Sequence, residues 1–288
     1  MKEQTKTAVI IGLISNIILF SVKLAAGLLS NSIAVISDAA NSFIDIFSSF
    51  VISRSVKVAS KKADKDHPFG HHGAEPIGAL IIAIITGVLG FELFRESIMR
   101  LITPIKESAG LIAISALIIS ITAKTVLYIY FKKVQSSTNS PAIGAAMIDS
   151  KNDILASTVA LAGVFTSYLG LNRFDAIAGI LVSILIFISG YKLALENLDY
   201  LMGKSPSDNF LLKLREKAIS CKGVIGVNDI RAHFMGNKIN VELHAEVDEK
   251  INTKRSHDIG KAVQKKLEDM HDINKAFIHV DPMKNRKK

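Results

Sequence analysis

The sequence predicts a helical membrane domain of six spans followed by a small α+β domain. Of the 288 residues, 49% are hydrophobic, the mean hydropathy is +0.33, and there is no tryptophan. The apolar residues gather into six long stretches, and a helix needs only about 20 mainly apolar residues to cross the hydrocarbon core. The composition changes at residues 203–208, where a turn-forming segment breaks the last stretch. We therefore expect a membrane domain at residues 1–203 and a second domain at residues 204–288.

The expected spans cover about residues 7–30, 33–58, 74–101, 108–131, 141–170 and 175–202. The first stretch is too long and too weakly cationic for a signal peptide, and it lacks a small-residue cleavage pattern. Lysine and arginine precede the first span and follow the second and fourth, whereas the opposite connections carry few. By the positive-inside rule both termini and the loop after the second span are cytoplasmic. The net charge of +9 thus indicates topology and anionic lipid contact, not nucleic-acid binding.

The second domain has the order αββαβ. The periodicity predicts a helix, two strands joined by a turn at Asn237, a second helix and a last strand, at residues 208–220, 226–235, 238–247, 253–270 and 275–280. This order gives a three-stranded sheet with helices on one face. Strict alternation in the first strand would place Val227 with Asp229 and Arg231, opposite Ile230 and Ala232. The single cysteine, Cys221, excludes an intramolecular disulfide and thiolate metal clusters.

Oxygen-bearing side chains recur four residues apart inside two expected spans. Asn41 and Asp45 lie in the second span, and Asp149 and Asp153 in the fifth. Residues i and i+4 share one face of a helix, so two opposed helices would form a four-ligand oxygen cage for a hard divalent cation. A carboxylate at bilayer depth costs several kcal/mol and persists only for a function or a partner. The alternative is that the aspartates pair with Lys23 or Lys151 near the membrane surface.

The loop after the second span concentrates further metal-binding side chains. Within residues 64–72 it carries three histidines and two aspartates, bent by Pro68 and Gly70. Asp64, His67 and His71 are the candidate ligands of a transition metal there. The second domain adds a third candidate set, made up of His244, His257, His279 and Asp281. His279 and Asp281 are two residues apart in a strand, so their side chains point to one face of the sheet.

Together these features resemble the cation diffusion facilitator family, and the resemblance covers the whole chain. It lies in the six spans, the NxxxD and DxxxD patterns, the loop DHPFGHHGAEP, and the αββαβ domain that ends in IHVDP. The resemblance implies a homodimer that exports a divalent cation in exchange for protons, with no prosthetic group and no enzymatic activity. It also implies a copper-chaperone-like cytoplasmic domain that dimerises and binds metal.

The sequence differs from the zinc-exporting members of the family at ligand positions, and these differences bear on which metal is transported. Those relatives carry histidine at the position of Asp149, whereas the cage here has only oxygen ligands. Oxygen ligands suit Mn²⁺ and imidazole suits Zn²⁺, and the pattern resembles the manganese branch. We therefore expect Mn²⁺ first and Fe²⁺ next, with Zn²⁺, Cd²⁺ and Co²⁺ less favoured. Asn228 stands where zinc exporters have a histidine ligand, and Gly73 stands where some relatives have a lysine that links the subunits.

Two other classes of membrane protein share part of this pattern. An intramembrane aspartyl protease needs one acid on each of two helices and a GxGD signature, which this sequence lacks. A membrane-anchored metal sensor would not need ligands inside its spans. The expected protein is therefore a multi-pass metal exporter, and the charge pattern suits a bacterial inner membrane.

Overall fold

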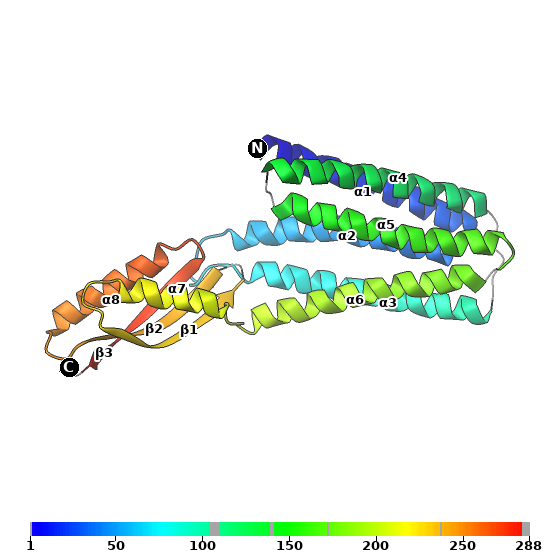
Figure 1. The fold of residues 1–288 in the computed structure, drawn as a ribbon. Coiled ribbons are helices and arrows are strands. Elements are labelled where there is room, and N and C mark those ends of the chain that lie inside the picture. The colour runs from blue at the N-terminus through cyan, green and yellow to red at the C-terminus, as the bar shows by residue number, and fades with distance from the viewer. Residues whose placement is uncertain (1, 104–109, 139–140, 172, 237, 284–288) are drawn as a thin grey trace. The chain divides into compact units, whose positions relative to one another are not determined.

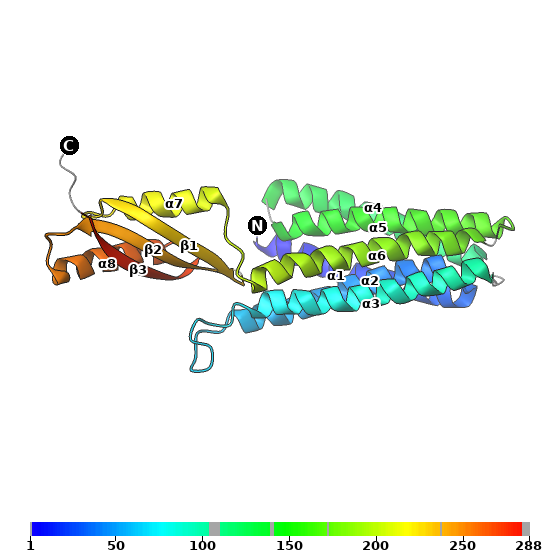
Figure 2. The same cartoon turned by 90° about the horizontal axis from the view of Figure 1, so that it is seen from below.

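The computed structural model describes residues 2–103, 110–138, 141–171, 173–236 and 238–283. They form two compact units, one of residues 1–51 and 81–194 and the other of residues 52–80 and 195–288. The membrane domain contains six long helices: α1 (Lys2–Ser30), α2 (Ile33–Ala59), α3 (Ala74–Ile102), α4 (Gly110–Thr138), α5 (Pro141–Tyr168) and α6 (Arg173–Leu201). In the first unit α4 and α5 run side by side (Figures 1 and 2).

Among the described residues, five of these helices are long and apolar enough to cross a membrane. The exception is α5, whose charged residues Asp149, Lys151 and Asp153 lower the hydropathy of its first half. A ligand-bearing span is expected to score poorly for this reason, because the side chains that serve a transport site are the ones a hydropathy scale penalises. Crossing by α5 as a sixth span stays a prediction.

The first unit has many exposed apolar side chains and buries two of its lysines. Large aliphatic side chains such as Ile14, Ile18 and Leu28 are exposed, whereas Lys23 and Lys124 are buried. A soluble domain has the opposite distribution, because water solvates surface charges and expels apolar groups. An apolar exterior of this extent indicates that lipid surrounds the bundle.

Small residues allow the helices to approach one another closely. Alanines of five helices meet in one buried cluster that contains Ala26, Ala34, Ala116, Ala160 and Ala178. On α3, a Cβ atom at Gly90 would lie 2.9 Å from the backbone nitrogen of Phe187 on α6. Small side chains at helix interfaces are typical of membrane bundles, where close van der Waals packing replaces the hydrophobic effect as the main cohesive force.

The N-terminus of α2 is hydrogen-bonded to a residue that lies far away in the sequence. Asp175, in the first turn of α6, accepts hydrogen bonds from the backbone N–H groups of Ile33 (2.8 Å) and Ala34 (3.3 Å) and from the hydroxyl of Ser32 (2.5 Å). The Ser32 hydroxyl oxygen in turn accepts from the N–H of Val35 at 3.2 Å. The first N–H groups of a helix have no partner within it, so these contacts satisfy the N-terminus of the helix that carries Asn41 and Asp45.

The second domain has the predicted order αββαβ. It consists of α7 (Asp208–Ile219), β1 (Gly226–Met235), β2 (Lys238–Asp248), α8 (Thr253–Glu268) and β3 (Ile273–Met283). The strands lie in the order β1-β2-β3, with β1 antiparallel and β3 parallel to β2 (Figure 1). Leu214 of α7 and Val263 and Leu267 of α8 share one core with Val241 and Leu243 of β2. Cys221 is free and is one of the buried residues of this core. Asn237, the residue predicted to form the turn, lies outside the described residues.

Strict alternation was the wrong expectation for the start of β1. Val227 lies opposite Ala245 and Ile230 lies opposite Leu243, with a shift of register between them. Val227 is therefore buried in the core, against which the partly buried Ile230 also packs, and does not lie on the outer face with Arg231. The physical reason is a β-bulge, which places an extra residue in one strand and reverses the alternation beyond it.

Candidate metal sites

The predicted oxygen ligands of α2 and α5 face one another within the first unit. The side-chain amide of Asn41 donates a hydrogen bond to Asp153 Oδ1 at 2.9 Å. Asp45 lies within electrostatic range of both Asp149 and Asp153. Asp153 is buried, whereas Asp149 is exposed. The four side chains thus lie where α2 and α5 meet, and Asp153 is the buried one among them.

A lysine that sequence reasoning did not single out occupies this site. Lys124 of α4 forms an ion pair with Asp153 Oδ2, and its ammonium group also donates to Asn16 Oδ1 of α1 at 2.7 Å. The sequence held a signal for it, because Lys124 stands alone within the long apolar run of residues 110–131. An ionisable residue inside a span is by default a functional candidate.

A second buried ion pair lies in the same bundle. Lys23 of α1 contacts Asp38 Oδ2 of α2 at 2.8 Å, and both side chains are fully buried. Lys23 also donates to the Ser42 hydroxyl at 3.1 Å, and the Ser157 hydroxyl donates to Asp38 at 2.7 Å. Lys23, considered above as a partner for the ligand aspartates, therefore pairs with Asp38 instead, and the other candidate partner, Lys151, is exposed.

The loop before α3 brings its three predicted ligands together. The ligand atoms of Asp64, His67 and His71 all lie within 4.8 Å of one another. Asp64 contacts His71 Nε2 at 3.2 Å and His67 Nδ1 at 3.5 Å. The backbone N–H groups of His67 and Asp66 donate to Asp64 Oδ1 at 2.7 and 3.1 Å. Chiefly through the bond from His67, these contacts hold the pKa of Asp64 below its usual value, so the carboxylate is ionised and available to a cation.

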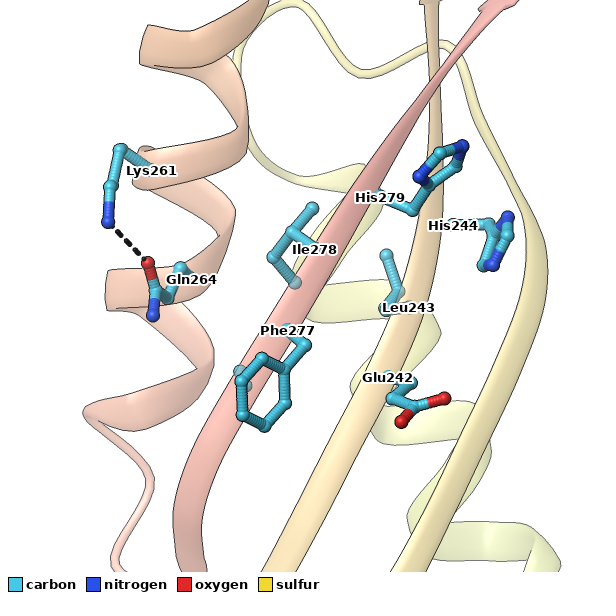
Figure 3. A pocket seen from close by; sticks show the side chains of 9 residues that line it. Glu242, Leu243, His244, Lys261, Gln264, Phe277, Ile278 and His279 are labelled. Atoms are coloured by element: carbon cyan, nitrogen blue, oxygen red, sulfur yellow. Dashed lines mark hydrogen bonds between the residues drawn. The ribbon is translucent and has the colours of Figure 1, made fainter. Parts of the chain in front are cut away.

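In the second domain His244, His279 and Asp281 form another compact group. Parallel pairing sets His244 of β2 beside His279 of β3, with their ring centroids 4.7 Å apart. Asp281 contacts His244 Nδ1 at 3.0 Å and His279 Nε2 at 3.1 Å. Figure 3 shows His244 and His279 at one end of a pocket of about 490 Å³ that also borders Phe277 of β3. Two imidazoles and a carboxylate at these distances can hold a metal ion.

His257 stands apart from this group. It is exposed on α8, a helix whose Ile259, Val263 and Leu267 pack against the inner face of the sheet. His244 projects from the outer face of the sheet, so the described residues of a single chain do not bring His257 to it. Neither compact group of three His or acidic ligands found among the described residues includes Asp45, Asp149 or Asp153. The side chains of the membrane site are thus less tightly gathered than those of the other two sites.

Both parts of the chain match known domains. Residues 9–202 match the cation efflux transmembrane domain, and residues 206–283 match the cytoplasmic domain of cation efflux proteins. An uncharacterized transporter of Methanocaldococcus jannaschii is 34% identical, over 98% of this chain and 99% of that protein. The manganese efflux system protein MneP of Bacillus subtilis is 31% identical, over 98% of this chain and 97% of that protein.

Among solved structures, the MamM CTD in a cadmium form is 24% identical, with a TM-score of 0.26. That match covers 27% of this chain and 98% of the other. The two domain matches together span nearly the whole chain, and its apolar helices and small sheet fit them. The chain belongs to the cation efflux family, also called cation diffusion facilitators, and is a multi-pass membrane transporter that exports divalent metal cations.

Proposed function

We propose that the transporter exports Mn²⁺ from the cytoplasm in exchange for protons. The observation that carries the proposal is the all-oxygen ligand set where α2 and α5 meet: the amide of Asn41 and the carboxylates of Asp45, Asp149 and Asp153. Carboxylate and carbonyl oxygens suit Mn²⁺, whereas a zinc site usually includes imidazole or thiolate. The likeness to the manganese efflux protein MneP supports this choice.

Proton exchange follows from the chemistry of the ligands. A carboxylate must be deprotonated to bind a metal ion, so metal and protons compete for the same oxygens. The ligand set contains no histidine, and the three aspartates therefore have to serve both cargoes. Protons that enter from the outer side would displace the metal there, and metal would displace protons on the cytoplasmic side.

The proposal includes the topology and the assembly of the protein. Both termini and the loop of Asp64, His67 and His71 are placed in the cytoplasm of a bacterium, with the bundle in its inner membrane. The second domain joins two copies into a homodimer, as the match to a dimerising cytoplasmic domain supports. His244, His279 and Asp281 are proposed to bind metal there and to adjust the dimer.

Transport by the purified protein tests the proposal. Proteoliposomes that hold a metal-sensitive dye and a pH-sensitive dye should show Mn²⁺ entry coupled to proton exit. Asp45→Ala and Asp153→Ala should abolish both fluxes. Glu92→Ala is the matched control and should transport normally, because Glu92 is an α3 carboxylate that pairs with Arg95 on the exterior.

Four results would contradict parts of the proposal. Wild-type fluxes in either aspartate variant would show that the cage is not the transport site. Metal movement without a pH change would exclude proton exchange. Faster transport of Fe²⁺, or of Zn²⁺ and Cd²⁺, in the same vesicles would show that this metal, and not Mn²⁺, is the main cargo. No transport of any metal would favour a membrane-anchored sensor.

A further inference from the structure

Both oxygens of Asp153 are already engaged by hydrogen-bond donors. Oδ1 accepts from the Asn41 amide, and Oδ2 contacts the ammonium group of Lys124. The side chains of Lys124 and Asp153 are 3% and 2% exposed, so no solvent separates the pair. Each carboxylate oxygen can take a second partner, but the ammonium group on Oδ2 repels a divalent cation, so a metal ion that binds Asp153 competes with Lys124.

Lys124 is the donor that a cation would displace. An ammonium group has three donors and no acceptor, so it cannot coordinate a metal. It also repels a divalent cation, whereas Asn41 can turn its carbonyl oxygen toward one. Lys124 already has a second partner, because its ammonium group lies 2.7 Å from the side-chain oxygen of Asn16 on α1. It can therefore leave Asp153 without losing every hydrogen bond.

The charges of the loaded site balance when Lys124 is present. Asp45, Asp149 and Asp153 carry three negative charges when ionised, which a divalent cation and the Lys124 ammonium together balance. Without the lysine the loaded site would keep one uncompensated carboxylate inside the membrane and the empty site would keep three, so the metal would relieve more repulsion on binding. Without the metal, Lys124 keeps the most deeply buried of the three carboxylates neutralised.

We propose that Lys124 is a tethered cation that competes with the transported metal for Asp153. Its ammonium group holds Asp153 in the unloaded site, withdraws toward Asn16 when a divalent cation arrives, and returns to Asp153 as the metal leaves. The competition lowers the affinity of the cage and speeds release. This inference rests on the proposed function, because it requires that Asp153 is a ligand of the cargo.

The rival role for Lys124 is purely structural, as a link between α4 and α5. The two roles predict different effects of removing Lys124 on metal affinity. If Lys124 competes with the metal, its removal makes the site more negative and frees Asp153, so the metal binds more tightly. If Lys124 only holds the helices, its removal loosens the cage, so the metal binds equally well or more weakly.

The experiment is calorimetric titration of Mn²⁺ into the purified full-length protein, with transport measured on the same preparations. We expect Lys124→Met to tighten binding on the order of ten- to a hundredfold, because unit charges a few ångströms apart interact strongly at an effective dielectric constant near 20. Its turnover should fall because release slows. Lys124→Arg keeps the charge and should bind nearly as the wild type does. Lys23→Met is the matched control: it removes the other buried lysine, which contacts Asp38 and Ser42, and should tighten binding much less than Lys124→Met does.

Unchanged or weaker binding in a folded Lys124→Met variant would overturn the inference and leave Lys124 a structural link. If that variant does not fold, the wild-type structure determined with Mn²⁺ decides. Separation of the Lys124 ammonium from Asp153 supports the inference, and an intact pair beside the bound metal overturns it. Failure of the proposed function looks different, because the wild type would then bind no Mn²⁺ or would bind it unchanged in Asp45→Ala.

Discussion

Replacing Asp175 by alanine should destabilise the helix that carries two of the transport ligands. Asp175 accepts hydrogen bonds from the N–H groups of Ile33 and Ala34, which lie 142 and 141 residues away in the sequence. All three residues are buried, at 4%, 2% and 0% exposure, so water cannot easily replace the lost carboxylate. Asn41 and Asp45 lie on the same helix, two to three turns further along. The loss should therefore disturb metal binding as well as stability.

The size of the effect follows from the groups left without a partner. Each buried N–H that loses its acceptor costs about 1–3 kcal/mol, so two of them cost about 2–6 kcal/mol. Part of this is offset because a desolvated carboxylate is removed as well. We expect the free energy of unfolding to fall by about 2–4 kcal/mol, somewhat more than the loss of an ordinary N-cap side chain, which costs about 0.5–2 kcal/mol.

Denaturant titration of the detergent-solubilised protein, followed by far-ultraviolet circular dichroism, measures this loss. Asp175→Asn keeps one acceptor oxygen and should lose less stability than Asp175→Ala. Asp199→Ala removes a carboxylate of α6 that forms an exposed ion pair with Lys204, and it should change stability by less than about 1 kcal/mol. If Asp175→Ala is no more destabilising than Asp199→Ala, then water or a neighbouring group satisfies the start of α2 and the reasoning is wrong.

Three further predictions concern the metal sites. Asp149→His should shift the transport preference towards Zn²⁺, because imidazole replaces an oxygen ligand. Competitive uptake of Mn²⁺ and Zn²⁺ measures this preference, and an unchanged ratio of the two uptake rates would show that residue 149 does not set selectivity. The lowered pKa of Asp64 should stabilise the loop turn at neutral pH, with the contribution lost as the pH falls below the usual aspartate pKa of about 3.9. The pH dependence of the NMR signal of the Asp64 carboxyl carbon measures this, and a midpoint at or above that usual value would refute the turn. Residues 205–288 should fold alone, dimerise and bind Zn²⁺ more tightly than Mn²⁺, and His279→Ala should weaken this binding about tenfold or more in calorimetry. His271→Ala, at an exposed histidine outside the group, should leave the binding intact.

Much of the membrane site was open to prediction from local sequence. The four-residue spacing of Asn41 with Asp45, and of Asp149 with Asp153, fixes both pairs on helix faces whatever the rest of the chain does. Local periodicity was also sufficient for β2, where two-residue alternation predicted a buried row from Ile239 to Val247, and these residues are buried. The order αββαβ followed from breaks in periodicity and from turn residues, which are also local properties.

The contacts that complete the sites were beyond local reasoning. The pairing of Lys124 with Asp153, and not with another buried acid, depends on how α4 packs against α5. The hydrogen bonds between Asp175 and the start of α2 likewise join segments far apart in the chain. His257 looked equivalent to His244 in sequence, yet α8 packs on the opposite face of the sheet.

Local sequence was sufficient to predict the apolar helices, the polar residues that each helix face presents, and the class of cargo that oxygen ligands suit. These follow from periodicity and side-chain chemistry, which act over a few residues. Three features had to come from the folded chain: which buried charges neutralise one another, where the β-bulge turns Val227 into the core, and which histidines meet. Those outcomes depend on packing between segments distant in sequence, where a shift of one residue or one helix face changes every partner.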